Sequence, residues 1–246
     1  MRSYSQADSG FVQDGLKGGI VQACAEAKTL DVAAQRAVEF LYNEFENSAL
    51  LRVYATVKFA KLPADNQAFV RKLATQTGVL NELKDNTLVL SLLGTRGRKR
   101  EWNDRRSSQG HIGIPLVSAK FVESIPMISR LLSEFGILAN WFGEDDATEL
   151  ITKTLGRLGA VFHVADAATQ RDAAQRLIIP AQDFVAAERI KSVFGVGGAY
   201  MDGTVCAFLL FTRESLDRAT ADRFLPLINY FKTGTVPLVG SGKFFS

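Results

Sequence analysis

The hydrophobic pattern of residues 190–212 predicts a β-hairpin near the end of the chain. Two apolar runs flank the dipeptide Asp202-Gly203, which favours tight hairpin turns because glycine accepts the positive φ that such turns need. Every position of the second run, 205–211, is apolar, so neither face of that strand is suited to water. We therefore expect the strand in the middle of a sheet, followed by a helical run that ends near Thr233.

Further strands are predicted earlier in the chain. Residues 51–59 alternate between apolar and polar side chains, which is typical of a half-buried strand with one face toward water. The remaining strands are expected at 87–93, at HIGIPL (111–116) and at VFHV (161–164).

Apolar residues at helical spacing predict two helices before the first strand, one from Gly15 and one with Asp31 as its N-cap. Residues 1–14 resemble a loose arm. Pro63 is expected to open a third helix, where its missing N–H costs little, and Ser124 to cap a fourth, after a short turn capped by Ser118. Further helices are expected at 148–157 and within 166–189, with an acidic connection that carries Trp141 and Phe142 at 137–147.

This order of elements favours an α+β fold, with an antiparallel sheet and helices packed on its faces. No shift in composition divides the chain, so we expect one domain at 49–240, an N-terminal helical extension at 1–48 and a flexible tail at 241–246. The N-terminal helices would either cover one face of the sheet or pair with a second copy in a homodimer, and the pattern leaves both open.

Composition predicts a folded cytoplasmic protein. Hydrophobic residues make up 47% of the 246 residues, enough for a sizeable core. No apolar run is long enough for a membrane helix, and the N-terminus lacks the apolar centre of a signal peptide. Cys24 and Cys206 lie far apart in apolar surroundings, which predicts buried free thiols in a reducing compartment and no metal site.

Positive charge is concentrated in residues 96–106. This segment has six basic and two acidic residues, so its charge is +4. Because the net charge of the whole chain is +3, the remaining residues sum to −1. One basic loop in an otherwise neutral chain is thin support for nucleic-acid binding. Most charge runs are solvated surface, and Arg98, Lys99 and Arg100 are expected to face solvent.

Four motifs resemble a GAF-like variant found in bacterial sensor kinases and related signalling proteins, with a match that spans roughly 50–240. The motifs are EWNDRR…GH..IPL at 101–116, FHV at 162–164, IPAQDFV at 179–185 and IKSVFGVGG at 190–198. The resemblance implies a GAF-like sheet flanked by helices, in a bacterial small-molecule sensing module of signal transduction. Long N-terminal helices in such sensors often pair across a dimer.

The loop from 101 to 111 supplies the candidate site. The resemblance covers six polar or aromatic residues that are candidates for binding a ligand or a partner: Trp102, Asn103, Asp104, Arg105, Arg106 and His111. Arginine forks suit carboxylates and phosphates, and Trp102 offers a stacking face. Alternatively, the carboxylates pair with neighbouring arginines and fix the loop, and this structural or interface role is favoured. We expect the Trp102 ring to be buried, and Asp104 to meet Arg105, Arg106 or backbone N–H groups.

The two histidines, His111 and His163, are the candidates for a haem ligand, because some GAF sensors hold haem through a histidine. Neither has a second metal-type residue nearby in the sequence, so a hydrogen-bonded structural histidine is favoured for each and the cofactor stays unknown. The glycines of 195–198 lack dinucleotide-binding spacing and predict a bulge or close packing. Residues 240–243 fail as a phosphate-binding loop.

No nucleophile elbow, zinc-binding helix pair or other catalytic motif is present, so we expect no enzymatic activity. The leading hypothesis is a regulatory GAF-like protein that binds a small molecule or a protein partner. It would signal through a partner in trans, since we find no output domain. The alternatives are a ligand-free interaction or scaffold module and, with less support, a nucleic-acid binder that uses 96–106.

Overall fold

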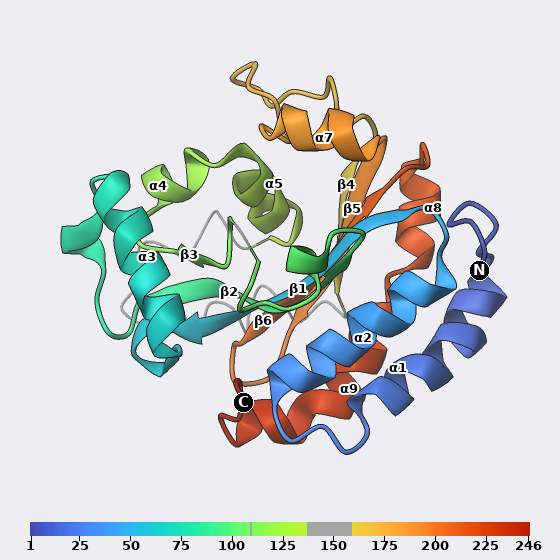
Figure 1. The fold of residues 1–246 in the computed structure, drawn as a ribbon, viewed down its shortest axis with the longest axis horizontal. Helices are drawn as coiled ribbons and strands as arrows, with labels where there is room; N and C mark the ends of the chain where they lie inside the picture. Colours follow the sequence, from blue (N-terminus) through green and yellow to red (C-terminus); the bar gives the residue numbers. More distant parts are fainter. Residues whose placement is uncertain (109, 137–158) are drawn as a thin grey trace.

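A six-stranded sheet forms the centre of the computed structural model, which describes residues 1–108, 110–136 and 159–246 (Figure 1). The strand order is β3-β2-β1-β6-β5-β4, and all neighbours are antiparallel. This confirms the α+β architecture. The strands are β1 Ser48–Lys58, β2 Leu88–Gly97, β3 Gly113–Pro115, β4 Ala160–Val164, β5 Ser192–Ala199 and β6 Val205–Thr212.

Helices cover both faces of this sheet. The α-helices are α1 Leu16–Cys24, α2 Leu30–Glu44, α3 Ala64–Gln76, α4 Ala119–Glu123, α5 Pro126–Glu134, α7 Gln182–Glu188, α8 Arg218–Arg223 and α9 Pro226–Gly240. Shorter turns are a π-helix at Phe11–Gly15 (η1) and 3-10 turns at Phe59–Lys61 (η2), Leu80–Glu82 (η3) and Arg100–Trp102 (η4). None of the helices in the described ranges has the length and apolar character that crossing a membrane requires.

The predicted hairpin is confirmed, and it places β6 at the centre of the sheet. Strand β6 pairs with β5 on one side and β1 on the other, and all of its residues are buried. At the turn, Gly203 has φ 83°, and the Asp202 carboxylate accepts a hydrogen bond from the Thr204 N–H at 2.9 Å. The alternation along β6 supplies both cores of the protein, because successive side chains point to opposite faces.

One face of the sheet is covered by α1, α2 and α9, which lie together in Figure 1. Helix α2 packs directly on β2 at Gly94, where a side-chain carbon would stand 2.6 Å from the backbone carbonyl carbon of Ala34. Both Cys24 and Cys206 are free and buried on this face, as expected. The N-terminal helices therefore cover the sheet, while their pairing in a dimer stays a prediction.

The expected loose arm and flexible tail are wrong, because both ends of the chain pack against the core. Tyr4 is fully buried, and its ring stacks on Phe45 with centroids 4.2 Å apart. At the other end, the carbonyls of Lys243 and Phe244 accept hydrogen bonds of 2.8 and 3.0 Å from the N–H groups of Leu30 and Asp31. The tail thus satisfies two of the donors that the start of any helix leaves unpaired.

Several element boundaries differ from the expected ones. Asp31 lies in the first turn of α2, whose N-cap is Thr29, and Ile125 rather than Ser124 precedes α5, which begins at Pro126. The Ser118 cap is confirmed by its bond with the Phe121 N–H. Strand β2 continues to Gly97, and α9 continues to Gly240 with Pro237 inside it. The expected connection at 137–147, with Trp141 and Phe142, and the whole of the expected helix at 148–157 lie outside the described residues.

Candidate functional site

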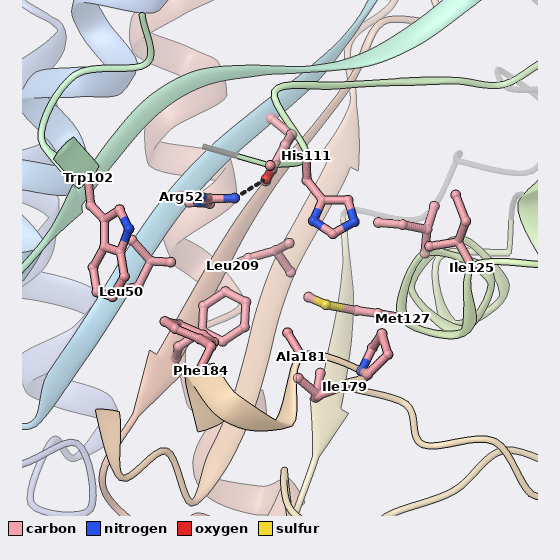
Figure 2. Close-up of a pocket in the computed structure, with 15 residues that line it drawn as sticks. Leu50, Arg52, Trp102, His111, Ile125, Met127, Ile179, Ala181, Phe184 and Leu209 are labelled. Carbon is pink, nitrogen blue, oxygen red and sulfur yellow. Dashed lines mark hydrogen bonds between the residues drawn. The ribbon is translucent and has the colours of Figure 1, made fainter. Parts of the chain in front are cut away.

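A pocket with a volume of about 360 Å³ lies on the face of the sheet opposite α1, α2 and α9. Strands β1 and β6 form its floor, α5 and α7 form two walls, and the loop after β2 closes it (Figure 2). Most of its lining is apolar: Leu50, Ile125, Met127, Ile128, Ile179, Phe184, Leu209 and Phe211. A concave apolar cavity with a few polar groups is the usual form of a small-molecule site.

The floor contradicts the prediction of a wet face on β1. Arg52, Tyr54 and Thr56 are buried, with exposed fractions of 8, 4 and 2%. Arg52 pairs across the sheet with Leu209 of β6, and cross-strand partners share a face. Since β6 is covered on both faces, a strand beside it cannot present one face to water. Arg52 and Tyr54 therefore line the pocket, while Thr56 is buried outside it.

Arg52 is the charged residue of the pocket lining. Its Nη1 donates to the Tyr54 hydroxyl at 3.1 Å, and its Nη2 donates to the Ser108 Oγ at 3.0 Å. Its Nε is buried and has no hydrogen-bond partner among the described residues. Arg52 and Tyr54 were not predicted as site residues, because the alternation of β1 alone places both side chains on a solvent-facing side. The sequence signal that indicates their burial is the neighbouring strand β6, whose apolar residues on both faces show that the sheet is covered on both sides.

His111 stands at the mouth of the pocket, open to solvent on one side. It follows Gly110 (φ 70°) and itself adopts φ 48°, an uncommon conformation for a residue with a side chain. In Figure 2 its ring and the Arg52 guanidinium approach the same space. Desolvation by the surrounding protein lowers the pKa of His111, and the positive charge of Arg52 lowers it further. A neutral imidazole is therefore favoured at neutral pH.

Trp102 also lines the pocket, and its expected burial is confirmed at 9% exposure. The indole packs edge-on against Phe184 of α7, with ring centroids 5.4 Å apart. On its other side, the Lys99 ammonium lies 5.0 Å from the ring centroid. Trp102 thus joins the loop to α7 and forms one end of the cavity, and Lys99 is exposed, as expected.

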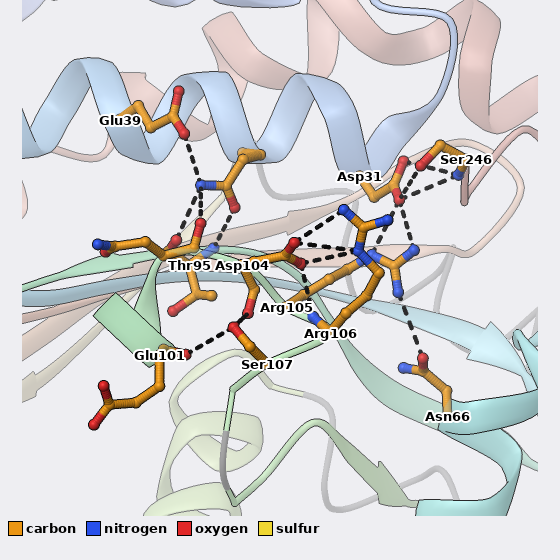
Figure 3. A network of polar contacts seen from close by, with 12 residues as sticks. Asp31, Glu39, Asn66, Thr95, Glu101, Asp104, Arg105, Arg106, Ser107 and Ser246 are labelled. Carbon is orange, nitrogen blue, oxygen red and sulfur yellow. Dashed lines mark hydrogen bonds and ion pairs between the residues drawn. The ribbon is translucent and has the colours of Figure 1, made fainter. Parts of the chain in front are cut away.

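The other four residues of the predicted site lie outside the pocket, in a polar network beside α2 (Figure 3). The Asn103 side chain accepts from the Gly97 N–H at 3.0 Å. Asp104 accepts from the backbone N–H of Arg106 at 2.9 Å and pairs with its guanidinium at 2.9 Å, as expected. That hydrogen bond and ion pair lower the pKa of Asp104. These contacts hold the loop in one shape.

Arg105 anchors this network. Its Nε and Nη2 lie 3.0 and 2.8 Å from Oδ2 of Asp31 in α2. Both side chains are almost fully buried, at 9 and 5% exposure. The guanidinium also lies 4.8 Å from the ring centroid of Phe245. The loop that closes the pocket is thereby tied to the start of α2 and to the end of the chain.

Arg98 differs from the expected free surface charge. Its side chain is 63% exposed, yet it forms a 3.0 Å ion pair with Glu188, whose side chain is 1% exposed. Arg213 also pairs with Glu188, at 3.2 Å. Glu188 ends α7, so Arg98 links the basic loop to the helix that walls the pocket. Sequence spacing could not reveal this, because 90 residues separate the partners.

His163 lies away from the pocket. It alternates along β4 with Phe162 and Val164, which belong to the pocket-side core. Its Nε2 lies 2.8 Å from the Leu216 carbonyl, so Nε2–H donates to that oxygen. Across the described ranges of the chain, no cluster of three or more histidine, cysteine or acidic side chains is arranged to hold a metal ion.

The glycine segment at 195–198 packs closely, as one of its two expected interpretations predicts. A side-chain carbon on Gly197 would stand 2.1 Å from the Phe135 ring, and the register between β5 and β6 is continuous, without a bulge. Gly197 therefore lets Phe135 lie against the sheet at the pocket-side core.

No protein-family model matches the chain, and no curated protein matches it. Among solved structures, the chain is similar to the phycoerythrobilin-bound GAF domain from a cyanobacterial phytochrome. The identity is 9% and the TM-score 0.45, over 96% of this chain and 98% of that one. The six-stranded antiparallel sheet with helices on both faces agrees with the α+β class that the order of elements predicted.

Proposed function

We propose that this chain is a sensory module that binds a small molecule in the pocket over β1 and β6. The observation that carries the proposal is the pocket itself, an apolar cavity of about 360 Å³ into which Arg52, Tyr54 and His111 converge. Such sites commonly measure about 300–1,000 Å³ and combine apolar walls with a few polar groups that orient the ligand. We propose a non-catalytic role, because the sequence carries no catalytic motif.

The pocket favours this function over the two alternatives. A ligand-free scaffold would gain nothing from an arginine that faces an apolar cavity and has no ion pair among the described residues, since burying an unpaired charge is costly. A nucleic-acid binder would need free basic residues. Within 96–106, three of the six basic residues, Arg98, Arg105 and Arg106, instead pair with carboxylates of the chain itself.

The closing loop offers a route by which ligand binding reaches the rest of the protein. The pocket side of the loop carries Trp102 and His111, and its other side holds α2 through Arg105 and Asp31. A ligand that contacts the loop would favour one arrangement of it, and so bias the position of α2. We propose that a partner protein or a second copy of the chain reads this change.

Blocking the pocket tests the proposal. Ala181, the N-cap of α7, is an exposed residue of the pocket lining, and Ala186 is an exposed residue of α7 outside the lining. We expect Ala181→Trp to obstruct the cavity and Ala186→Trp to leave it open, with both variants folded. Native mass spectrometry of the three purified proteins, followed by thermal-shift screening of a metabolite library, measures retained and added ligands.

The expected result is ligand binding to the wild type and to Ala186→Trp, and its loss in Ala181→Trp. Equal binding to all three proteins would place the ligand elsewhere. No binding to any of them would reject the sensory role. Light scattering of the same samples measures the oligomeric state and so tests the predicted homodimer.

A further inference from the structure

We propose that the ligand is an organic monoanion whose carboxylate pairs with Arg52 and whose apolar body fills the pocket. This inference rests on the proposed function and adds the chemical class of the ligand. Arg52 carries it, because it brings a charge into an apolar cavity and none of the ion pairs among the described residues involves it.

The guanidinium of Arg52 is held in place but not neutralised. Tyr54 and Ser108 accept one hydrogen bond each from the two terminal nitrogens, and these neutral hydroxyls supply no counter-charge. Arginine cannot lose its proton in a protein, and a buried charge without an opposite charge is strongly unfavourable. The Nε–H is buried and has no partner in the part of the chain that the structure describes, so it is a remaining donor for an anion.

The charge count in the pocket selects a carboxylate over a phosphate. Among the described residues of the pocket lining, Arg52 is the one with a permanent charge, and the lowered pKa of His111 favours a neutral ring at neutral pH. A single guanidinium matches one carboxylate, often through two parallel hydrogen bonds. A phosphate monoester carries about −1.5 to −2 charge at pH 7 and would bring surplus negative charge. The neutral His111 ring can donate one further N–H to the same anion.

The rest of the lining selects an apolar body. Leu50 and Leu209 lie on the floor with Arg52, and Phe184, Met127, Ile125 and Ile179 line the rest of the pocket (Figure 2). These side chains offer dispersion contacts and few hydrogen bonds. A molecule with an aromatic ring or a short alkyl chain and one carboxylate therefore matches both parts of the pocket.

Matched acid and amide probes test the charge requirement, because the two members of a pair share one apolar body. The pairs are benzoate with benzamide, cinnamate with cinnamamide, and octanoate with octanamide. Binding is measured by calorimetry and thermal shift on the wild type, Arg52→Met, Arg52→Lys and Arg96→Met. Arg96 is the control: it pairs with Leu51 across the sheet and lies over the Tyr42 ring, on the α2 face.

We expect at least one acid to bind the wild type about tenfold to a hundredfold more tightly than its amide. This difference in affinity is what one hydrogen bond to a charged group typically contributes. Arg52→Met should bring the acid to the level of its amide while leaving amide binding in place. Arg96→Met should behave as the wild type. Arg52→Lys keeps the positive charge and should keep part of the preference for the acid. A preference that survives in this variant shows that its loss in Arg52→Met comes from the missing charge and not from misfolding.

The results distinguish failure of the carboxylate proposal from failure of the proposed function. If amides bind as well as acids, or the acid preference survives in Arg52→Met, the carboxylate proposal is wrong and the sensory role stands. The same holds if no acid binds while native mass spectrometry finds a retained neutral molecule. If no probe binds and no ligand is retained, both proposals are rejected.

Discussion

Removing the charge of Asp31 should destabilise the protein strongly, because it would leave Arg105 buried without a counter-charge. The two side chains are 5 and 9% exposed and lie 2.8 Å apart. Apart from Asp31, the partners of the guanidinium among the described residues are the Asn66 side-chain oxygen at 3.5 Å and the Phe245 ring at 4.8 Å. Breaking a buried pair by removing one partner costs about 3–5 kcal/mol, a large part of the stability of a typical domain.

The reverse substitution, Arg105→Met, should cost less. Without Arg105, the Asp31 carboxylate still accepts hydrogen bonds from the Thr29 hydroxyl at 2.6 Å, the Val32 N–H at 2.8 Å and Ser246 at 3.2 Å. Asp31→Asn should therefore lower the free energy of unfolding by about 3 kcal/mol or more. In the double variant, part of that loss should be recovered, since charged neighbours couple by about 0.5–3 kcal/mol.

Urea unfolding followed by far-ultraviolet circular dichroism measures all three variants, with Asp104→Asn as the matched control. The ion pair between Asp104 and Arg106 is 2.9 Å long, close to the 2.8 Å of the pair between Asp31 and Arg105. It lies on the surface, where an ion pair contributes little to stability. If Asp31→Asn were no more destabilising than Asp104→Asn, or less destabilising than Arg105→Met, the buried anchor would be refuted. The loop would then need another support.

Three further predictions concern the pocket and its surroundings. Trp102→Ala should lower the free energy of unfolding by about 2–4 kcal/mol. This loss is toward the low end for a buried aromatic, because the ring already borders a cavity. Fluorescence of Trp102 that a soluble quencher removes completely would contradict its burial. Gly197→Ala should cost about 1–3 kcal/mol by displacing Phe135, and an unchanged melting temperature would contradict that packing. Because the pKa of His111 is lowered on folding, its contribution to stability should be fully present above about pH 6.5 and lost as pH falls below that value. The melting temperature of the wild type relative to His111→Asn should therefore decline between about pH 7 and pH 5, and parallel curves would contradict the shift.

Periodicity predicted the elements whose signal is local. The hairpin of β5 and β6 was predicted because a turn dipeptide separates two apolar runs, and the central place of β6 followed from apolar residues on both of its faces. The position of Trp102 followed from one large apolar ring in a charged segment. In each case, the residues that decide the structure are neighbours in the sequence.

The polar part of the pocket could not be predicted in the same way. Arg52 meets Ser108 across 56 residues, and Asp31 meets Arg105 across 74, so no local pattern records either contact. The packed ends of the chain were missed for a similar reason. Tyr4 and Phe244 are buried only because distant elements, the aromatic core and the start of α2, supply the surfaces that cover them.

A crystal structure of the protein with the tightest-binding acid of the probe set tests the central claim most directly. We predict the carboxylate within about 2.7–2.9 Å of the Arg52 guanidinium nitrogens, the range of charge-assisted hydrogen bonds, and the apolar body between Leu209 and Met127. An acid found outside the pocket, or one inside it with its carboxylate turned away from Arg52, would contradict the account.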